Sequence, residues 1–103
     1  MAFALTHCPS CRARQEADAP DDAPCRRCES PLTELRLLYA AATDWHEAAQ
    51  VAIAQARPDR ALFCARRAMA LLDIEPTRKT WCAALALAGY RDEAAALIER
   101  WRL

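Results

Sequence analysis

Glycine is almost absent from this chain, and other features that would point to a class of function are missing with it. Gly89 is the single glycine among 103 residues, and no stretch alternates β-branched with polar residues, so the sequence offers no candidate β-sheet. No apolar run is long enough to span a bilayer. No basic start leads into the apolar stretch that export requires. We therefore expect a cytoplasmic protein that does not enter a membrane.

Net charge is missing as well. The 14 basic and 14 acidic residues cancel, and a balanced chain lacks the excess of positive charge that holds nucleic acid without regard to sequence. The sequence also has no phosphate-binding glycine loop, no paired acid and base, and no nucleophile beside an activating base. We expect a protein that is not an enzyme.

Cysteine, in contrast, is plentiful near the start of the chain. Four of the six cysteines form two Cys-x-x-Cys hooks separated by thirteen residues, namely Cys8, Cys11, Cys25 and Cys28. Two thiolates two residues apart reach one ion from a single turn, and a second such turn completes a tetrahedral four-sulfur shell that suits Zn²⁺. Because cytosolic thiols stay reduced, the spacing predicts a structural zinc site and not disulfides. A rubredoxin-type iron centre uses the same four thiolates, so an electron carrier is an alternative.

The chain divides into two halves of different composition. Residues 1–31 contain four of the six prolines and little large apolar surface, so this segment needs a metal in place of a core. Residues 32–103 are dominated by alanine, leucine and arginine, with apolar residues recurring at helical spacing. We predict a zinc ribbon over 1–31 and a helical domain over 32–103 that folds on its own core.

Residues that typically start or stop a helix divide the second half into about five antiparallel helices. The sequence therefore predicts a mainly α fold. Asp44 followed by Glu47 resembles a capping box that opens a second helix. Pro58, Pro76 and Gly89 mark the remaining boundaries. Short joints between such helices imply that neighbours run antiparallel.

Parts of this helical half resemble tetratricopeptide repeats. The resemblance rests on a 33-residue period between Ala61 and Ala94, on Trp45, Ala49 and Cys82, and on the Ala-Gly-Tyr-Arg-Asp-Glu-Ala run at 88–94. Arg78 departs from it, because it stands where Trp45 stands in the first pair. An ordinary short helix bundle is the rival fold. The resemblance implies a concave groove lined by the first helix of each pair, here by His46, Gln50, Ile53, Lys79, Ala83 and Ala86.

The run from His7 to Cys11 and the run from Ala23 to Leu32 resemble the short bacterial zinc ribbons that precede unrelated domains. Such ribbons usually have glycine after each hook, where this chain has Arg12 and Glu29. Zinc ribbons also occur in nucleic-acid machinery, which makes a nucleic-acid-associated protein a second alternative. Acidic residues outnumber the arginines around the hooks, and they argue against it.

Together these patterns predict a non-enzymatic adaptor or assembly factor that binds another protein or a peptide. An apolar end to the chain allows a second mode of contact, a homodimer, through Leu97, Ile98, Trp101 and Leu103.

Overall fold

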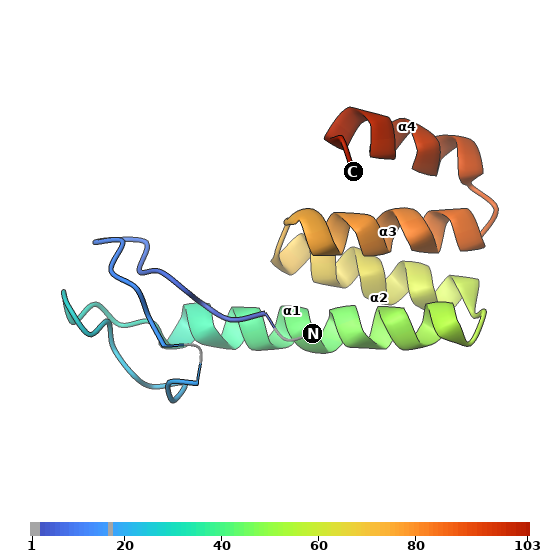
Figure 1. The fold of residues 1–103 in the computed structure, drawn as a ribbon. Coiled ribbons are helices and arrows are strands. Elements are labelled where there is room, and N and C mark those ends of the chain that lie inside the picture. Colours follow the sequence, from blue (N-terminus) through green and yellow to red (C-terminus); the bar gives the residue numbers. More distant parts are fainter. Residues whose placement is uncertain (1–2, 17) are drawn as a thin grey trace.

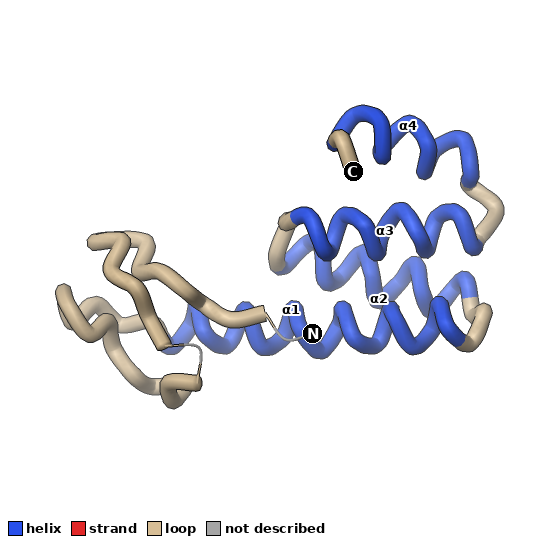
Figure 2. Tube along the Cα trace, in the orientation of Figure 1, coloured by secondary structure: helices blue, strands red, loops and turns tan. Residues whose placement is uncertain are grey.

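The computed structural model describes residues 3–16 and 18–103, which form an irregular N-terminal segment followed by four helices (Figure 1). The helices are α1 (Thr33–Ala54), α2 (Pro58–Leu71), α3 (Glu75–Leu87) and α4 (Arg91–Trp101). No β-strand occurs in these described ranges, and Figure 2 shows the described part of the segment before α1 as loop. The prediction of a mainly α chain without a sheet is confirmed.

The prediction of about five helices is wrong, because α1 runs without a break through the expected boundary at Asp44. No glycine or proline interrupts this stretch, so nothing forces the backbone out of the helix. The Thr43 hydroxyl donates to the carbonyl oxygen of Tyr39, one turn earlier in the same helix, at 2.9 Å. Asp44 is exposed in mid-helix and caps nothing.

The other three boundaries lie where the sequence places them. Pro58 is the first residue of α2, and Pro76 lies in the first turn of α3, where a missing N–H costs no helical hydrogen bond. Gly89 follows α3 with a φ of +95°, a left-handed conformation that favours glycine.

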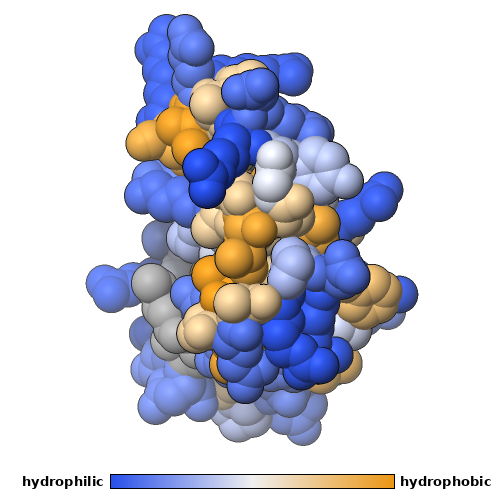
Figure 3. All heavy atoms as spheres, turned by 90° about the vertical axis from the view of Figure 1, so that its right-hand side faces the viewer, coloured by the Kyte–Doolittle hydropathy of each residue, from blue (hydrophilic) through white to orange (hydrophobic). Residues whose placement is uncertain are grey.

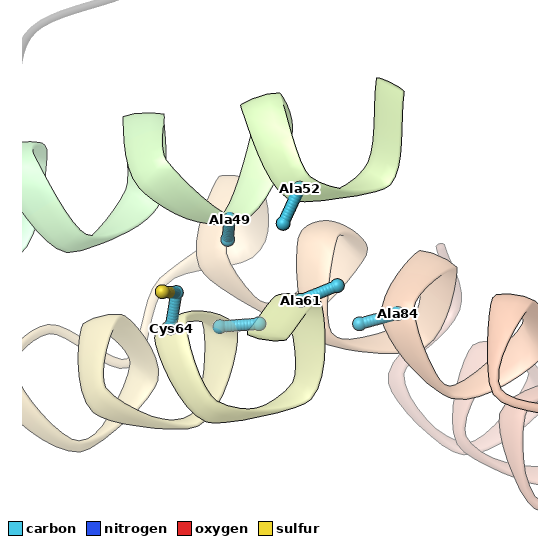
Figure 4. Close-up of a cluster of buried hydrophobic side chains, with 6 residues drawn as sticks. Ala49, Ala52, Ala61, Cys64 and Ala84 are labelled. Carbon is cyan, nitrogen blue, oxygen red and sulfur yellow. The ribbon is translucent and has the colours of Figure 1, made fainter. Parts of the chain in front are cut away.

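Small side chains form the core of the helical half. Five alanines and one cysteine are almost fully buried where α1, α2 and α3 meet, and they are Ala49, Ala52, Ala61, Cys64, Ala65 and Ala84. Figure 4 shows Ala49 and Ala52 of α1 pointing toward α2, with Ala84 of α3 beside Ala61. Because these side chains are short, the helix backbones approach closely. Larger residues such as Trp45 and Trp81 pack around the edge of the cluster.

The helices are not equally surrounded. Helix α3 packs against both α1 and α2, whereas α4 packs against α3 alone. The first half of α1 extends beyond the other helices and is covered by the N-terminal segment (Figure 1). None of the helices in the described ranges combines the length and hydrophobicity needed to cross a membrane.

Candidate metal centre

The two Cys-x-x-Cys hooks fold into turns of the same kind. In the first turn, the Arg12 N–H donates to the carbonyl oxygen of Cys8 at 2.8 Å. The Cys8 N–H donates to the carbonyl oxygen of Ala13 at 2.9 Å. In the second, the Glu29 N–H donates to the carbonyl oxygen of Cys25 at 3.0 Å. The Cys25 N–H donates to the carbonyl oxygen of Ser30 at 2.9 Å.

Both turns require a left-handed residue just after the hook. Arg12 has a φ of +63° and Glu29 a φ of +61°, conformations that cost a non-glycine residue about 1–2 kcal/mol. These are the two positions where zinc ribbons usually have glycine. Both turns therefore place a left-handed conformation at a residue other than glycine, which adopts it most easily.

The turns bring the four sulfur atoms of the hooks together. The Sγ atoms of Cys8, Cys11, Cys25 and Cys28 all lie within 4.8 Å of one another. Two of the separations are 3.7 Å, from Cys8 to Cys28, and 3.6 Å, from Cys11 to Cys25. Four sulfurs at about 2.3 Å from a central zinc ion would stand about 3.8 Å apart, whereas a disulfide needs about 2.05 Å. The cluster therefore fits one tetrahedral ion, and it can hold a metal.

Backbone dipoles favour the thiolate at Cys25. Its pKa is lowered to about 6 because the backbone N–H groups of Cys28 and Arg27 point at the sulfur. The Arg27 N–H lies 3.4 Å from that Sγ. The pKa of Cys28 is lowered as well, through the hydroxyl and N–H of Ser30.

Cys11 has the opposite tendency. The Ala13 N–H lowers its pKa, but burial and hydrogen bonds with the three neighbouring thiols outweigh that effect and raise the pKa to about 11. Four thiolates within one small cluster repel one another, so the last protons are hard to remove unless a cation takes their place. This requirement is the one that a divalent metal meets.

Gln15 also contacts this cluster, although no sequence pattern indicates it. Gln15 is only 5% exposed, and its Nε2 donates to the carbonyl oxygen of Ala13 at 2.9 Å and to the Sγ of Cys25 at 3.3 Å. Gln15 thus ties the first turn to a sulfur of the second. No local pattern distinguishes a glutamine of this kind from its polar neighbours in the connecting segment.

We expect the Gln15→Leu variant to bind zinc about tenfold or more weakly than the parent chain, because the Cys25 thiolate loses a hydrogen bond that orients it. Competition against a chromophoric chelator measures the change. Gln50→Leu is the matched control, since Gln50 is exposed on α1, away from the hooks. Equal zinc affinity in the parent and Gln15→Leu proteins would show that the amide does not support the metal.

The cysteine cluster shares an apolar core with the start of α1. Leu5, Cys8, Cys25 and Leu32 are buried together, and Leu35 and Tyr39 of α1 pack against them. Two hydrogen bonds reinforce the contact: Arg36 Nε donates to the carbonyl oxygen of Ala23 at 3.2 Å, and the Phe3 N–H donates to Thr43 Oγ1 at 2.8 Å. The first half of α1 therefore depends on the cysteine-rich segment to cover its apolar side.

Of the six residues expected to line a groove, the structure buries His46. His46 is 2% exposed, and its Nε2 lies 2.7 Å from Thr80 Oγ1. The Phe3 ring lies tilted against the His46 ring, with 4.9 Å between their centroids. Burial lowers the pKa of His46. The N-terminal segment returns across α1 and covers this position, so His46 does not line an open groove. Ile53 is half-buried against the alanine core, and Gln50 is exposed.

The remaining three residues are gathered at one surface hollow between α3 and α4. Lys79, Ala83 and Ala86 are exposed on α3, and they line a hollow of about 320 Å³. Ile98 and Leu103 close its other side. Ile98 is 43% exposed, so an apolar surface remains open here.

No protein-family model, curated protein or solved structure matches this chain.

Proposed function

We propose that this chain is a non-enzymatic adaptor, or an assembly factor, which holds a structural Zn²⁺ ion at its N-terminal hooks and binds a protein partner with its helices. The observation that carries the proposal is the hollow between α3 and α4. It joins three residues expected to contact a partner, Lys79, Ala83 and Ala86, with the exposed apolar side chain of Ile98.

Zinc is the metal that best suits the donor set. Four thiolates in a tetrahedral arrangement form a closed shell with no position for substrate, which favours a role in folding. Cys8, Cys11, Cys25 and Cys28 would hold the ion, and its charge would offset the repulsion among their thiolates. Elemental analysis of protein purified from its native host should give one zinc per chain. Stoichiometric iron, with its visible absorption, would support an electron carrier instead.

The order of helix contacts supports a tetratricopeptide-like stack. Helices α1 and α2 form one antiparallel hairpin and α3 and α4 form another, and α3 contacts both members of the first pair. Among the described helices, α4 packs against α3 alone. Ile98 of α4 stays exposed beside the hollow, and such an exposed apolar side chain favours a docked partner.

The shape and chemistry of the hollow indicate the partner. Cys82, Ala83 and Ala86 contribute small side chains to its lining. Lys79, which also lines it, forms an ion pair with Glu75 at 3.0 Å. Such a surface suits an amphipathic helix or an extended peptide with small apolar anchors. Figure 3 shows that hydrophobic side chains also form a band on the face made by the helix ends, with hydrophilic residues on both sides.

Photocrosslinking tests the hollow directly. A photoreactive amino acid at position 83 should capture a specific partner in the native host, whereas the same group at exposed position 95 of α4 should not. The captured protein is then purified and its affinity measured against the parent chain and the Ala83→Asp/Ala86→Asp variant. We expect the variant to lose at least about tenfold in affinity, because two carboxylates enter an apolar contact.

The control is the melting temperature of the double variant, which should stay within a few degrees of the parent because both alanines are exposed. Sedimentation of the purified chain separates a partner from a second copy. Unchanged affinity in the Ala83→Asp/Ala86→Asp variant would exclude the hollow as the contact surface.

A further inference from the structure

A second surface, on α2, combines positive charge with an exposed aromatic ring. Arg60, Arg66 and Arg67 are exposed on this helix, and Asp59 is its one acidic residue. The ion pairs found within the described ranges join Arg78 to Asp73 and Lys79 to Glu75, so none of the α2 arginines is paired with a carboxylate there. Phe63 lies on the same helix and is 52% exposed.

The helical period places these residues side by side. Positions 60, 63 and 67 are separated by three and four residues, and therefore share one face of α2. Arg66 lies next to them, and together with Phe63, Arg67 and Ala70 it lines a hollow of about 310 Å³. We call Arg60, Phe63, Arg66 and Arg67 the arginine–phenylalanine face. It shares no residue with the hollow between α3 and α4.

Aromatic contacts hold one of these cations in place. The Arg67 guanidinium lies 4.8 Å from the centroid of the Phe63 ring and 5.2 Å from that of Trp45 on α1. The two rings meet edge to face, with centroids 5.8 Å apart. No carboxylate within the described ranges pairs with this guanidinium, and the fork of N–H groups of a guanidinium matches a carboxylate.

The charges favour a particular kind of partner. The chain as a whole has no net charge, so the positive charge on α2 is a local feature and not a general affinity for polyanions. A local group of unpaired arginines complements carboxylates, and the exposed ring next to them offers an apolar contact. A phosphate backbone would instead call for positive charge spread over a longer surface.

We propose that the arginine–phenylalanine face docks an acidic peptide segment that carries an aromatic or large aliphatic side chain. The carboxylates bind Arg60, Arg66 and Arg67, and the apolar side chain covers Phe63. This surface is additional to the hollow between α3 and α4, and its binding does not depend on that proposal. A chain with both surfaces joins two partners.

The probe is a fluorescein-labelled twelve-residue peptide that contains six glutamates and one phenylalanine, titrated into the zinc-loaded full-length chain and followed by anisotropy. Two probes are compared with it: the same peptide with glutamine at every glutamate, and a labelled single-stranded DNA of twelve nucleotides. We expect saturable binding of the acidic peptide alone. Its affinity should fall as salt is added, because the contact is charged and exposed.

Two variants identify the surface. Arg60→Glu/Arg66→Glu should weaken peptide binding at least about tenfold, and Phe63→Ala should weaken it about threefold or more. Arg91→Glu/Arg100→Glu on α4 makes the same change of charge elsewhere and should leave binding within about twofold. The Ala83→Asp/Ala86→Asp variant, which alters the hollow between α3 and α4, should also bind the peptide normally. Peptide binding is thereby distinguished from the proposed adaptor contact.

The proposal is overturned if the peptide does not bind at millimolar concentration, or if the glutamine peptide binds equally well. It is overturned also if the two double arginine variants lose the same affinity, since that outcome shows a response to overall charge. Preferential binding of the DNA would identify the face as a nucleic-acid surface. Melting temperatures of all variants, expected within a few degrees of the parent, establish that each protein is folded.

Discussion

Removal of the proposed zinc ion should unfold the cysteine-rich segment and the first turns of α1 while α2, α3 and α4 stay helical. Structural zinc contributes on the order of 10 kcal/mol to the folding of small domains, and the segment has few apolar residues to replace it. Leu32, Leu35 and Tyr39 pack against Leu5 and the buried cysteines. When that cover is lost, the projecting half of α1 exposes its apolar side to water.

Hydrogen exchange measured by mass spectrometry checks this result after treatment with a strong chelator. Amides of the hooks and of about residues 33–40 should lose protection, and those near Ala49, Ala61 and Ala84 should keep it. Acidification should act in the same direction as chelation, because each thiolate takes up a proton as the metal leaves. Protection that falls uniformly through all four helices would show that the chain folds as one unit around its metal.

A substitution gives the same test without a chelator. Cys28 is exposed, so Cys28→Ser removes one ligand and hardly changes the packing. We expect zinc below one ion per chain and the exchange pattern of the metal-free protein. Cys82→Ser is the control, since Cys82 lies in α3 outside the cluster and its replacement should leave the metal content unchanged.

Local patterns predicted that Cys8, Cys11, Cys25 and Cys28 lie together, and the structure shows that cluster. Two intervening residues place Cys8 and Cys11 in one turn, and the same spacing places Cys25 and Cys28 in another. Only these two turns must then come together to form the cluster. Gln15 could not be predicted in this way. Its contact with Cys25 exists only after the two turns have met.

The errors in the helical half have similar origins. The pattern of Asp44 and Glu47 matches a helix start, but a cap forms only where the helix would otherwise end, and nothing ends α1 there. The burial of His46 depends on Phe3, which lies more than forty positions earlier in the chain. Helical periodicity places His46 on a face but does not say which distant segment covers that face.

The close packing of the alanine core predicts that a larger apolar side chain destabilises the helices, which the apolar pattern of the sequence alone does not predict. Ala65→Leu should lower the free energy of unfolding by about 3 kcal/mol, at the upper end of what overpacking usually costs. Ala65 has no exposed surface, and it lies among alanines of α1 and α3 that leave no room for a branched side chain. The leucine must push α2 away from its neighbours or adopt a strained rotamer, although it is more hydrophobic and is a good helix former.

Thermal melting followed by circular dichroism measures the effect, with an expected fall in the melting temperature of at least about 10 °C. Ala70→Leu is the matched control, because it makes the same chemical change at an exposed position of the same helix and should shift the midpoint by only a few degrees. Hydrophobicity and helix propensity change equally in the two variants, so the difference between them isolates the close approach of the helices. If Ala65→Leu melts at or above the parent temperature, the interface has space that the buried alanines do not fill, and the close packing of α1, α2 and α3 is not what stabilises the helical half.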